Sequence, residues 1–134
     1  MPIKIKNNIE EIGKVCEEAR IFCSKNDVPD AKYHDVAIIL DEVITNIISY
    51  AYPDGKEHFF SLDLQKGSGF IRIKFTDDGV AFDPLTLDAP DTISSLKERK
   101  VGGLGVYIVK QLAKSVKYSR ANGRNQLEIK ISTL

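Results

Sequence analysis

The sequence predicts a single domain that contains both helices and strands. Two long stretches before residue 52 repeat apolar side chains at helical spacing, and a pair of strand-like stretches around a glycine turn follows. One further helix and two further strands are expected near the C-terminus. The 134 residues contain no internal repeat and no linker, so we expect residues 1–134 to form one domain.

The N-terminal part is expected to hold a short strand and two helices. Residues 3–6 have a strand-like pattern, and Asn8 with Glu11 resembles a capping box at the start of the first helix. Residues 26–30 break this helix, and a second one continues from there to about residue 51. The apolar stripe of the second helix comprises Val36, Ile39, Leu40, Val43, Ile44, Ile47 and Ile48.

A hairpin and a long loop are expected next. Residues 58–65 and 70–75 alternate apolar and polar side chains on either side of a glycine-containing turn. Residues 84–100 contain two prolines and show weak periodicity, with one helical turn expected at residues 92–97. Loops longer than about 12–15 residues usually carry a function or are disordered.

The C-terminal part begins with a glycine cluster that leads into a helix with apolar residues from Val106 onward. Residues 116–120 and 127–131 then have strand patterns, and residues 121–124 have the composition of a turn.

Composition excludes several classes of protein. Nineteen basic residues balance nineteen acidic ones, so we expect no direct nucleic-acid partner and no membrane-surface binding. No apolar run approaches the ~20 residues that span a bilayer, and a cytoplasmic location is expected. Cys16 and Cys23 lie seven residues apart on one predicted helix, which separates them by roughly 10 Å and rules out a disulfide between them.

Glu42 and Asn46 are the first pair of candidate site residues. Their four-residue spacing places them side by side on the second helix, away from the centre of its apolar stripe. Such a pair is most often simply solvated. In the functional alternative, the Asn46 side-chain oxygen is a ligand suited to Mg²⁺, and Glu42 accepts a proton from an attacking hydroxyl or water.

The segment Asp77-Asp78-Gly79 follows a strand and has the composition of an ordinary turn. The functional alternative gives Asp77 a role in reading a base, because a carboxylate accepts a hydrogen bond from an exocyclic amine such as that of adenine. Gly79 would then let the backbone approach the base without a Cβ.

The glycine cluster Gly102-Gly103-Leu104-Gly105 precedes a helix. Backbone N–H groups at such a helix start bind phosphate, although a hinge would have the same composition. The cluster does not match the G-x-x-x-x-G-K-[ST] loop or a G-x-G-x-x-G motif. Lys97, Arg99 and Lys100 lie just upstream, where a cation could reach a terminal phosphate; a solvated loop is the alternative.

In this order the three motifs resemble those of the GHKL ATPase superfamily, which includes gyrase and histidine kinases. The matches are Glu42-x-x-x-Asn46 to the N box, Asp77-x-Gly79-x-Ala81 to the first glycine box, and Gly103-x-Gly105 with Gly102 to the second. The resemblance spans residues 30–132. The small size and the tail Tyr118-x-Arg120-x-x-Gly123-x-Asn125-x-Leu127 resemble the stand-alone branch that contains bacterial anti-sigma factor serine kinases.

The resemblance implies an α/β fold, specifically an α+β two-layer sandwich with a mostly antiparallel sheet, three helices on one face and an ATP lid at residues 84–101. It implies that ATP and Mg²⁺ bind, with Asn46 as the metal ligand and Asp77 on the adenine amine. The nucleotide-binding residues implied are Asn46, Asp77, Gly79, Ala81, Phe82, Lys100, Gly102, Gly103, Leu104, Gly105 and Val106.

The resemblance also implies a reaction and partners. Glu42 would be the general base that deprotonates a serine or threonine hydroxyl on a protein substrate, so the chain would be a protein serine/threonine kinase. The usual substrate in this branch is an anti-anti-sigma protein and the other partner is a sigma factor. A homodimer also fits the branch.

Three positions depart from the family pattern. Ala81 replaces the second glycine of the first glycine box, and Tyr50 stands where many members carry histidine. Asn125 and Gln126 fall near the place of a threonine that helps to hold adenine.

Two alternatives to the kinase remain open from the sequence. The first is a nucleotide-gated module that sequesters a partner and phosphorylates nothing. The second is a detached sensor-kinase ATPase domain that acts on a histidine of another protein. We expect neither a complete histidine kinase nor gyrase chemistry, because the chain has no phospho-accepting histidine helix ahead of the domain and is too short for gyrase.

Overall fold

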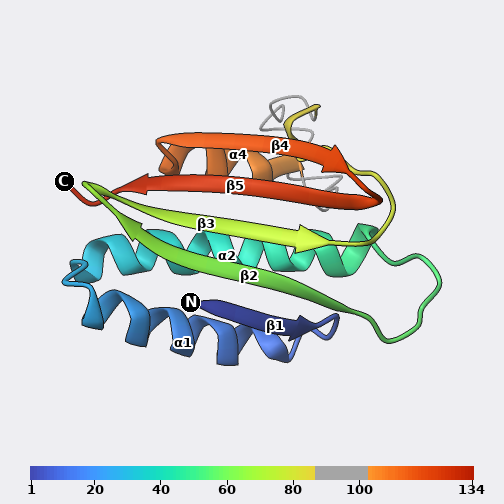
Figure 1. Cartoon of the computed structure of the whole chain (residues 1–134), viewed down its shortest axis with the longest axis horizontal. Coiled ribbons are helices and arrows are strands. Elements are labelled where there is room, and N and C mark those ends of the chain that lie inside the picture. The colour runs from blue at the N-terminus through green and yellow to red at the C-terminus, as the bar shows by residue number, and fades with distance from the viewer. Residues whose placement is uncertain (87–102) are drawn as a thin grey trace.

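The computed structural model describes residues 1–86 and 103–134, which form two layers (Figure 1). One layer is a five-stranded antiparallel sheet in the order β1-β2-β3-β5-β4. Its strands are β1 (Pro2–Lys6), β2 (Phe59–Gly67), β3 (Phe70–Asp77), β4 (Ser115–Ala121) and β5 (Arg124–Ser132). The helices α1 (Glu11–Lys25), α2 (Asp30–Tyr50) and α4 (Gly103–Leu112) lie on one face of the sheet. This arrangement confirms the predicted α+β sandwich with three helices on one face.

Helix α1 begins differently from the prediction. The Asn8 side chain accepts a hydrogen bond from the Glu10 N–H (3.0 Å), and the Glu11 carboxylate accepts one from the Lys6 N–H (3.4 Å). A backbone bond from Glu11 N–H to the Asn8 carbonyl (2.9 Å) forms a turn before the helix. The reciprocal capping box is therefore absent from this helix start, because the first helical turn lies further along the chain than expected. Cys16 and Cys23, both on α1, are free thiols as predicted.

The core lies between the sheet and the helices. Alternate residues of the central strands are buried against α2, as the two-residue period of a strand requires. The strand members of this core are Ile5, Phe60, Leu62, Leu64, Ile71, Ile73, Phe75, Ile129 and Ile131. Asp77 and Asn125 continue the inward-facing rows of β3 and β5 and are directly paired in register. The sheet therefore places two polar side chains at one end of an apolar core.

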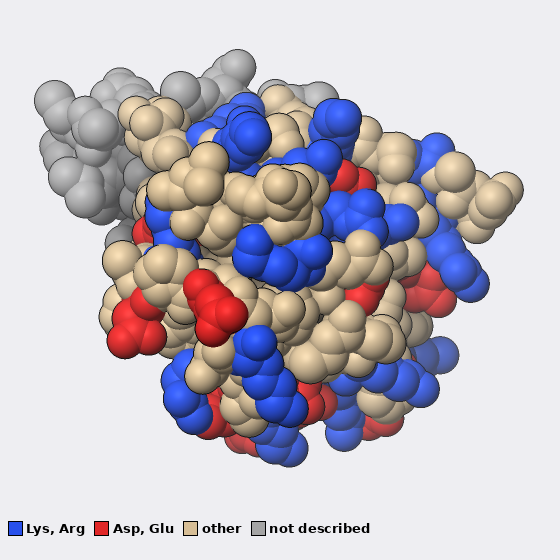
Figure 2. Space-filling model, turned by 60° about the vertical axis from the view of Figure 1, so that its left-hand side comes forward, with Lys and Arg blue, Asp and Glu red and all other residues tan. Residues whose placement is uncertain are grey.

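The other face of the sheet, which no described helix covers, is polar and mainly basic (Figure 1). Its charged side chains are Lys4, Lys6, Arg72, Lys74, Lys117, Arg124 and Lys130, with Asp63 and Glu128 between them. In Figure 2, Lys and Arg side chains lie in both halves of the view, and fewer acidic side chains lie among them in the upper half. Asp63 pairs with the N-terminal amine and Glu128 lies 4.0 Å from Lys130, so both acids already have basic neighbours. We call this surface the open face.

None of the helices in residues 1–86 and 103–134 combines the length and the apolarity that crossing a bilayer requires.

Candidate functional site

A pocket opens between α2, α4 and the inner face of the sheet. Most of its lining is apolar, from residues such as Val43, Ile47, Phe75 and Val109. The polar side chains that line it are Asn46, Asp77, Lys110, Tyr118 and Asn125. A mainly apolar pocket with a few converging polar groups is typical of a small-molecule site.

Asp77 ends β3 inside this pocket and is 7% exposed. Its Oδ1 accepts hydrogen bonds from the Gly79 N–H (3.0 Å) and from Asn125 Nδ2 (2.9 Å). Burial raises the pKa of the Asp77 carboxyl, and these two donors, with Arg120, partly oppose that rise. No hydrogen bond from the described residues reaches Oδ2, so this oxygen is available to a donor in the pocket.

Asn125 was not predicted as a site residue. The sequence analysis identified it only as a position that departs from the family pattern. Its side chain is buried, and Nδ2 also donates to the Val80 carbonyl (2.8 Å). Its Oδ1 accepts from the Phe82 N–H (3.4 Å) and from the Tyr118 hydroxyl. The alternating pattern of β5 could have predicted that Asn125 faces inward. Its pairing with Asp77 could not be predicted, because it depends on the register between β5 and β3.

Asn46 is likewise buried and lines the pocket from α2. No hydrogen bond among the described residues involves its carboxamide. No fully buried side-chain oxygen or nitrogen of those residues lacks a partner, so the Asn46 amide is not completely enclosed. Within those residues no group of three or more His, Cys, Asp or Glu side chains forms a metal cage. Asn46 therefore fits Mg²⁺ only where substrate oxygens and water supply the other ligands, as is usual for this ion.

Glu42 lies one helical turn before Asn46 and reaches the start of α4. A Cβ on Gly105 would stand 2.9 Å from Glu42 Cδ and would overlap its carboxylate oxygen Oε2. The Glu42 carboxylate thus packs directly against the first turn of α4. The predicted helix from Val106 is confirmed, but it begins earlier, within the glycine cluster at Gly103.

Gly79 has a packing role that the sequence did not indicate. A Cβ at this position would lie 2.7 Å from the carbonyl carbon of Ala51, which follows α2. The Val80 N–H donates to the Ala51 carbonyl (2.9 Å) and fixes this approach. The missing side chain of Gly79 therefore faces the end of α2. Gly79 and the exposed Ala81 are not among the described residues that line the pocket.

Phe82 and Val106 both line the pocket, although they are far apart in sequence. The Phe82 ring stacks on Tyr50, with ring centres 5.0 Å apart and an interplanar angle of 20°. Tyr50, which replaces the usual histidine, thus packs on a lining residue.

Part of the predicted site lies outside the described residues. Lys100 and Gly102 belong to this part, as do the expected turn at 92–97 and most of the expected lid at 84–101. Residues Pro84–Thr86 form the 3-10 helix η1. Gly103 and Leu104 begin α4, where the structure describes only their helical backbone.

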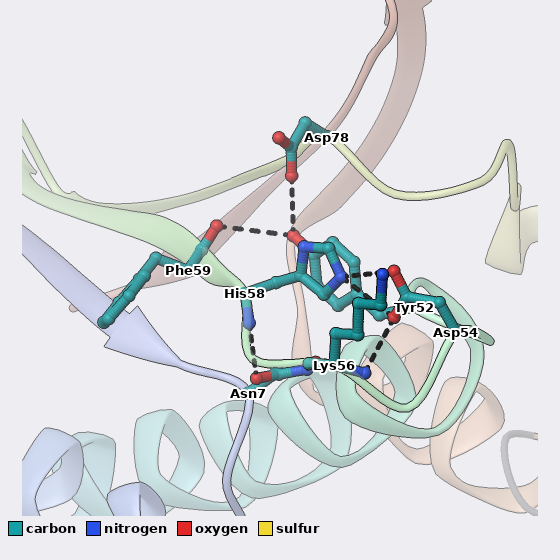
Figure 3. A network of polar contacts seen from close by, with 7 residues as sticks. All are labelled: Asn7, Tyr52, Asp54, Lys56, His58, Phe59 and Asp78. Carbon is teal, nitrogen blue, oxygen red and sulfur yellow. Dashed lines mark hydrogen bonds and ion pairs between the residues drawn. The ribbon is translucent and has the colours of Figure 1, made fainter.

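A second polar network supports the turn after Asp77 (Figure 3). The Tyr52 hydroxyl lies 3.0 Å from Asp78 Oδ1 and 3.4 Å from the Phe59 carbonyl. The His58 ring stacks on Tyr52 with centres 4.3 Å apart, and its Nε2 lies 2.8 Å from Asp54 Oδ2. Burial, and then the hydrogen bond to Asp78, raise the pKa of the Tyr52 hydroxyl above its ordinary range.

Asn7 joins this network to the segment that follows α2. Its Oδ1 accepts from the His58 N–H (2.8 Å), and its Nδ2 donates to the Lys56 carbonyl (2.9 Å). The sequence analysis did not predict this network, which holds segments distant in sequence beside Asp78 (Figure 3).

Comparison with known proteins agrees with this geometry. Residues 5–131 match the histidine kinase-like ATPase domain, so the match covers nearly the whole chain. The chain belongs to this family. The predicted GHKL-type assignment is thereby confirmed.

One curated relative is the serine/threonine-protein kinase BtrW of Bordetella bronchiseptica strain RB50. It is 27% identical over 94 residues, which cover 70% of this chain and 66% of BtrW. The aligned part thus spans about two thirds of that relative.

Two solved structures are similar in fold. The blue-light activated histidine kinase of Erythrobacter litoralis EL346 has a TM-score of 0.58 at 23% identity, covering 80% of this chain and 32% of that one. The SiaB–SiaC complex of Pseudomonas aeruginosa has a chain with a TM-score of 0.58 at 13% identity, covering 96% and 88% respectively. At these identities the likeness concerns the fold.

Proposed function

We propose that this chain binds Mg-ATP in the pocket and transfers the terminal phosphate to a serine or threonine hydroxyl of a partner protein. The observation that carries this proposal is the placement of Glu42. Its carboxylate packs against the first turn of α4 at Gly105 and lies one turn from the buried amide of Asn46. A nucleotide-binding site with a carboxylate at its phosphate end has the groups that phosphoryl transfer needs.

The two ends of the pocket would bind different parts of the nucleotide. Asp77 Oδ2 is the acceptor proposed for the adenine amine, because Oδ1 is already engaged. Phe82 and Val106 provide apolar surface for the base. At the other end, the backbone N–H groups at the start of α4 favour negative charge, which suits phosphate oxygens. This proposal also includes six further nucleotide-binding residues that the family resemblance implies: Gly79, Ala81, Lys100, Gly102, Gly103 and Leu104.

Glu42 would act as the general base. Its carboxylate takes the proton of the acceptor hydroxyl as that oxygen forms a bond to the terminal phosphorus. The bond from this phosphorus to the bridging oxygen breaks, and ADP leaves with the electron pair. Asn46 would hold Mg²⁺ through its amide oxygen, and the ion supplies neutralisation of the phosphate charge.

The partners proposed are those of the anti-sigma branch. The kinase name of BtrW supports an acceptor hydroxyl on protein, and we propose an anti-anti-sigma protein as acceptor and a sigma factor as second partner. A homodimer and a cytoplasmic location belong to the same proposal. The presence of Glu42 favours a kinase over a nucleotide-gated binding module, since a binding module needs no base there.

Nucleotide binding and partner capture test the proposal. Titration calorimetry with Mg-ATP and Mg-ADP should show binding, and no binding to either would contradict the whole proposal. Pull-downs from the source cell in ATP and in ADP should recover different partners. Labelling with γ-³²P-ATP should then give an acid-stable phosphate on one of them. An acid-labile phosphate would indicate a histidine acceptor, and no label would indicate a binding module.

A further inference from the structure

We propose that Asn125 is a positioning residue that sets the base selectivity of the pocket by holding Asp77 in one orientation. This inference rests on the proposed nucleotide binding. The contacts that carry it converge on one buried carboxamide, 5% exposed, at the junction of β3, β5 and the segment after Asp77.

The orientation of the Asn125 carboxamide is fixed from both ends. Nδ2 donates to Asp77 Oδ1 (2.9 Å) and to the Val80 carbonyl (2.8 Å). Oδ1 accepts from the Phe82 N–H (3.4 Å) and the Tyr118 hydroxyl. A flipped amide would place its oxygen against a carboxylate and a carbonyl, and its NH₂ against an N–H donor. Because neither arrangement is favourable, only one orientation satisfies all four neighbours.

This fixed amide directs one oxygen of Asp77 into the pocket. Oδ1 is engaged by Asn125 and by the Gly79 N–H, so Oδ2 is the oxygen left for a ligand. A carboxylate oxygen accepts hydrogen bonds and donates none when ionised. It therefore selects a base with an amine at the matching position, such as adenine, over hypoxanthine, which carries a carbonyl oxygen there.

The same contact supports the charge of Asp77. Burial disfavours the ionised carboxylate, whereas the Asn125 and Gly79 donors favour it. The other charged groups that act on this carboxylate are Arg120, which favours ionisation, and Asp78, which opposes it. Lys110 and Tyr118 also line the pocket. Loss of the Asn125 donor should thus move the acidic limit of nucleotide binding toward higher pH.

The test compares ATP with inosine triphosphate, which has a carbonyl in place of the amine. For the full chain, calorimetry should give a tenfold or greater preference for ATP, as expected when a charged acceptor loses its donor. Asn125→Leu has a similar size but no hydrogen-bonding groups. This variant should bring the ratio of ATP affinity to ITP affinity close to one. It should also raise the pH at which ATP binding is half lost on acidification. The matched control is Gln126→Leu, on the opposite face of the same strand, which should keep both values.

A second variant covers the case in which Asn125→Leu fails to fold. Tyr118→Phe removes only the hydroxyl that holds Asn125 Oδ1, and it should lower the ATP-to-ITP ratio about threefold, since one neutral hydrogen bond is lost. A folded Asn125→Leu protein with the wild-type ratio and pH profile would overturn the inference, as would an unchanged ratio in Tyr118→Phe if the leucine variant is unfolded. If the wild-type chain binds neither nucleotide, the proposed function itself fails, which is a distinguishable result.

Discussion

The carboxylate of Glu42 on α2 occupies the space where a side chain on Gly105 of α4 would stand. The two helices can approach this closely only because residue 105 has no Cβ. This explains a glycine inside the first turn of a helix, a position at which glycine otherwise costs about 1 kcal/mol relative to alanine.

Gly105→Ala should therefore displace the Glu42 carboxylate. A misplaced reacting group can cost about 10²-fold in rate, so we expect a loss of this order in single-turnover phosphoryl transfer to the captured partner. Gly13→Ala is the matched control, because the space around Gly13 in α1 is open. It should stabilise the protein by up to about 1 kcal/mol in urea unfolding and leave transfer unchanged. Equal transfer rates in both variants would show that the Glu42 position is not critical.

Glu42→Gln should separate binding from chemistry. The amide keeps the size of the side chain but cannot accept the proton, so transfer should fall by about 10²-fold or more while Mg-ATP affinity changes little. Asp41→Asn, at the exposed neighbouring position, removes the same charge without altering the site and should behave as wild type. Undiminished transfer by Glu42→Gln would exclude Glu42 as the general base.

Asp77→Asn should lower the affinity for ATP and raise the stability of the folded protein at neutral pH. The amide cannot offer a charged acceptor to adenine, so ATP affinity should fall tenfold or more. Burial raises the folded-state pKa of Asp77 above its ordinary value of 3.8, and the folded protein then binds more protons than the unfolded one. The contribution of Asp77 to stability therefore falls as pH rises through this interval.

Two measurements check this prediction. Above the folded pKa, Asp77→Asn should unfold at a higher temperature than wild type, and the difference should close as the pH falls toward 3.8. Wild-type ATP affinity should also decline on acidification before an exposed aspartate would be protonated. A variant that is less stable than wild type at neutral pH would mean that ionised Asp77 is a net stabilising group.

Tyr52→Phe should weaken the network around Asp78 (Figure 3). Loss of the hydroxyl contact should lower the free energy of unfolding by about 1 kcal/mol at neutral pH. The folded pKa of Tyr52 is raised, so its contribution is present below about pH 10 and is lost as the pH rises toward the folded value. The gap between wild type and variant should thus narrow in alkaline solution.

Tyr107→Phe provides the control for this prediction, because Tyr107 is 42% exposed on α4. The free energy of unfolding of this variant in urea should match that of wild type at neutral pH and in alkaline solution. A Tyr52→Phe protein as stable as wild type at neutral pH would show that the contact to Asp78 contributes nothing.

Local sequence patterns were sufficient for the elements and for part of the site. Period-two alternation identified the central strands, and the spacing of Glu42 and Asn46 placed both on one side of α2, with Asn46 in the pocket. Asn125 and Tyr118 escaped prediction because their roles depend on the register between strands that are distant in sequence. The contact of Gly79 with Ala51 could not be predicted for the same reason, because Ala51 lies beyond the end of α2 and far from Gly79 in sequence.

The open face of the sheet shows that the balanced charges of this chain are unevenly distributed over its surface. The chain has no formal net charge, yet the charged side chains of the open face are mainly positive, so negative side chains must predominate on the rest of the molecule. Such a molecule is an electric dipole, and its orientation matters when it approaches any charged object. Near neutral pH it should be retained on a sulfonate resin through this one face, although its zero net charge predicts that it would flow through. Raising the ionic strength should release it, because salt screens the field of the face.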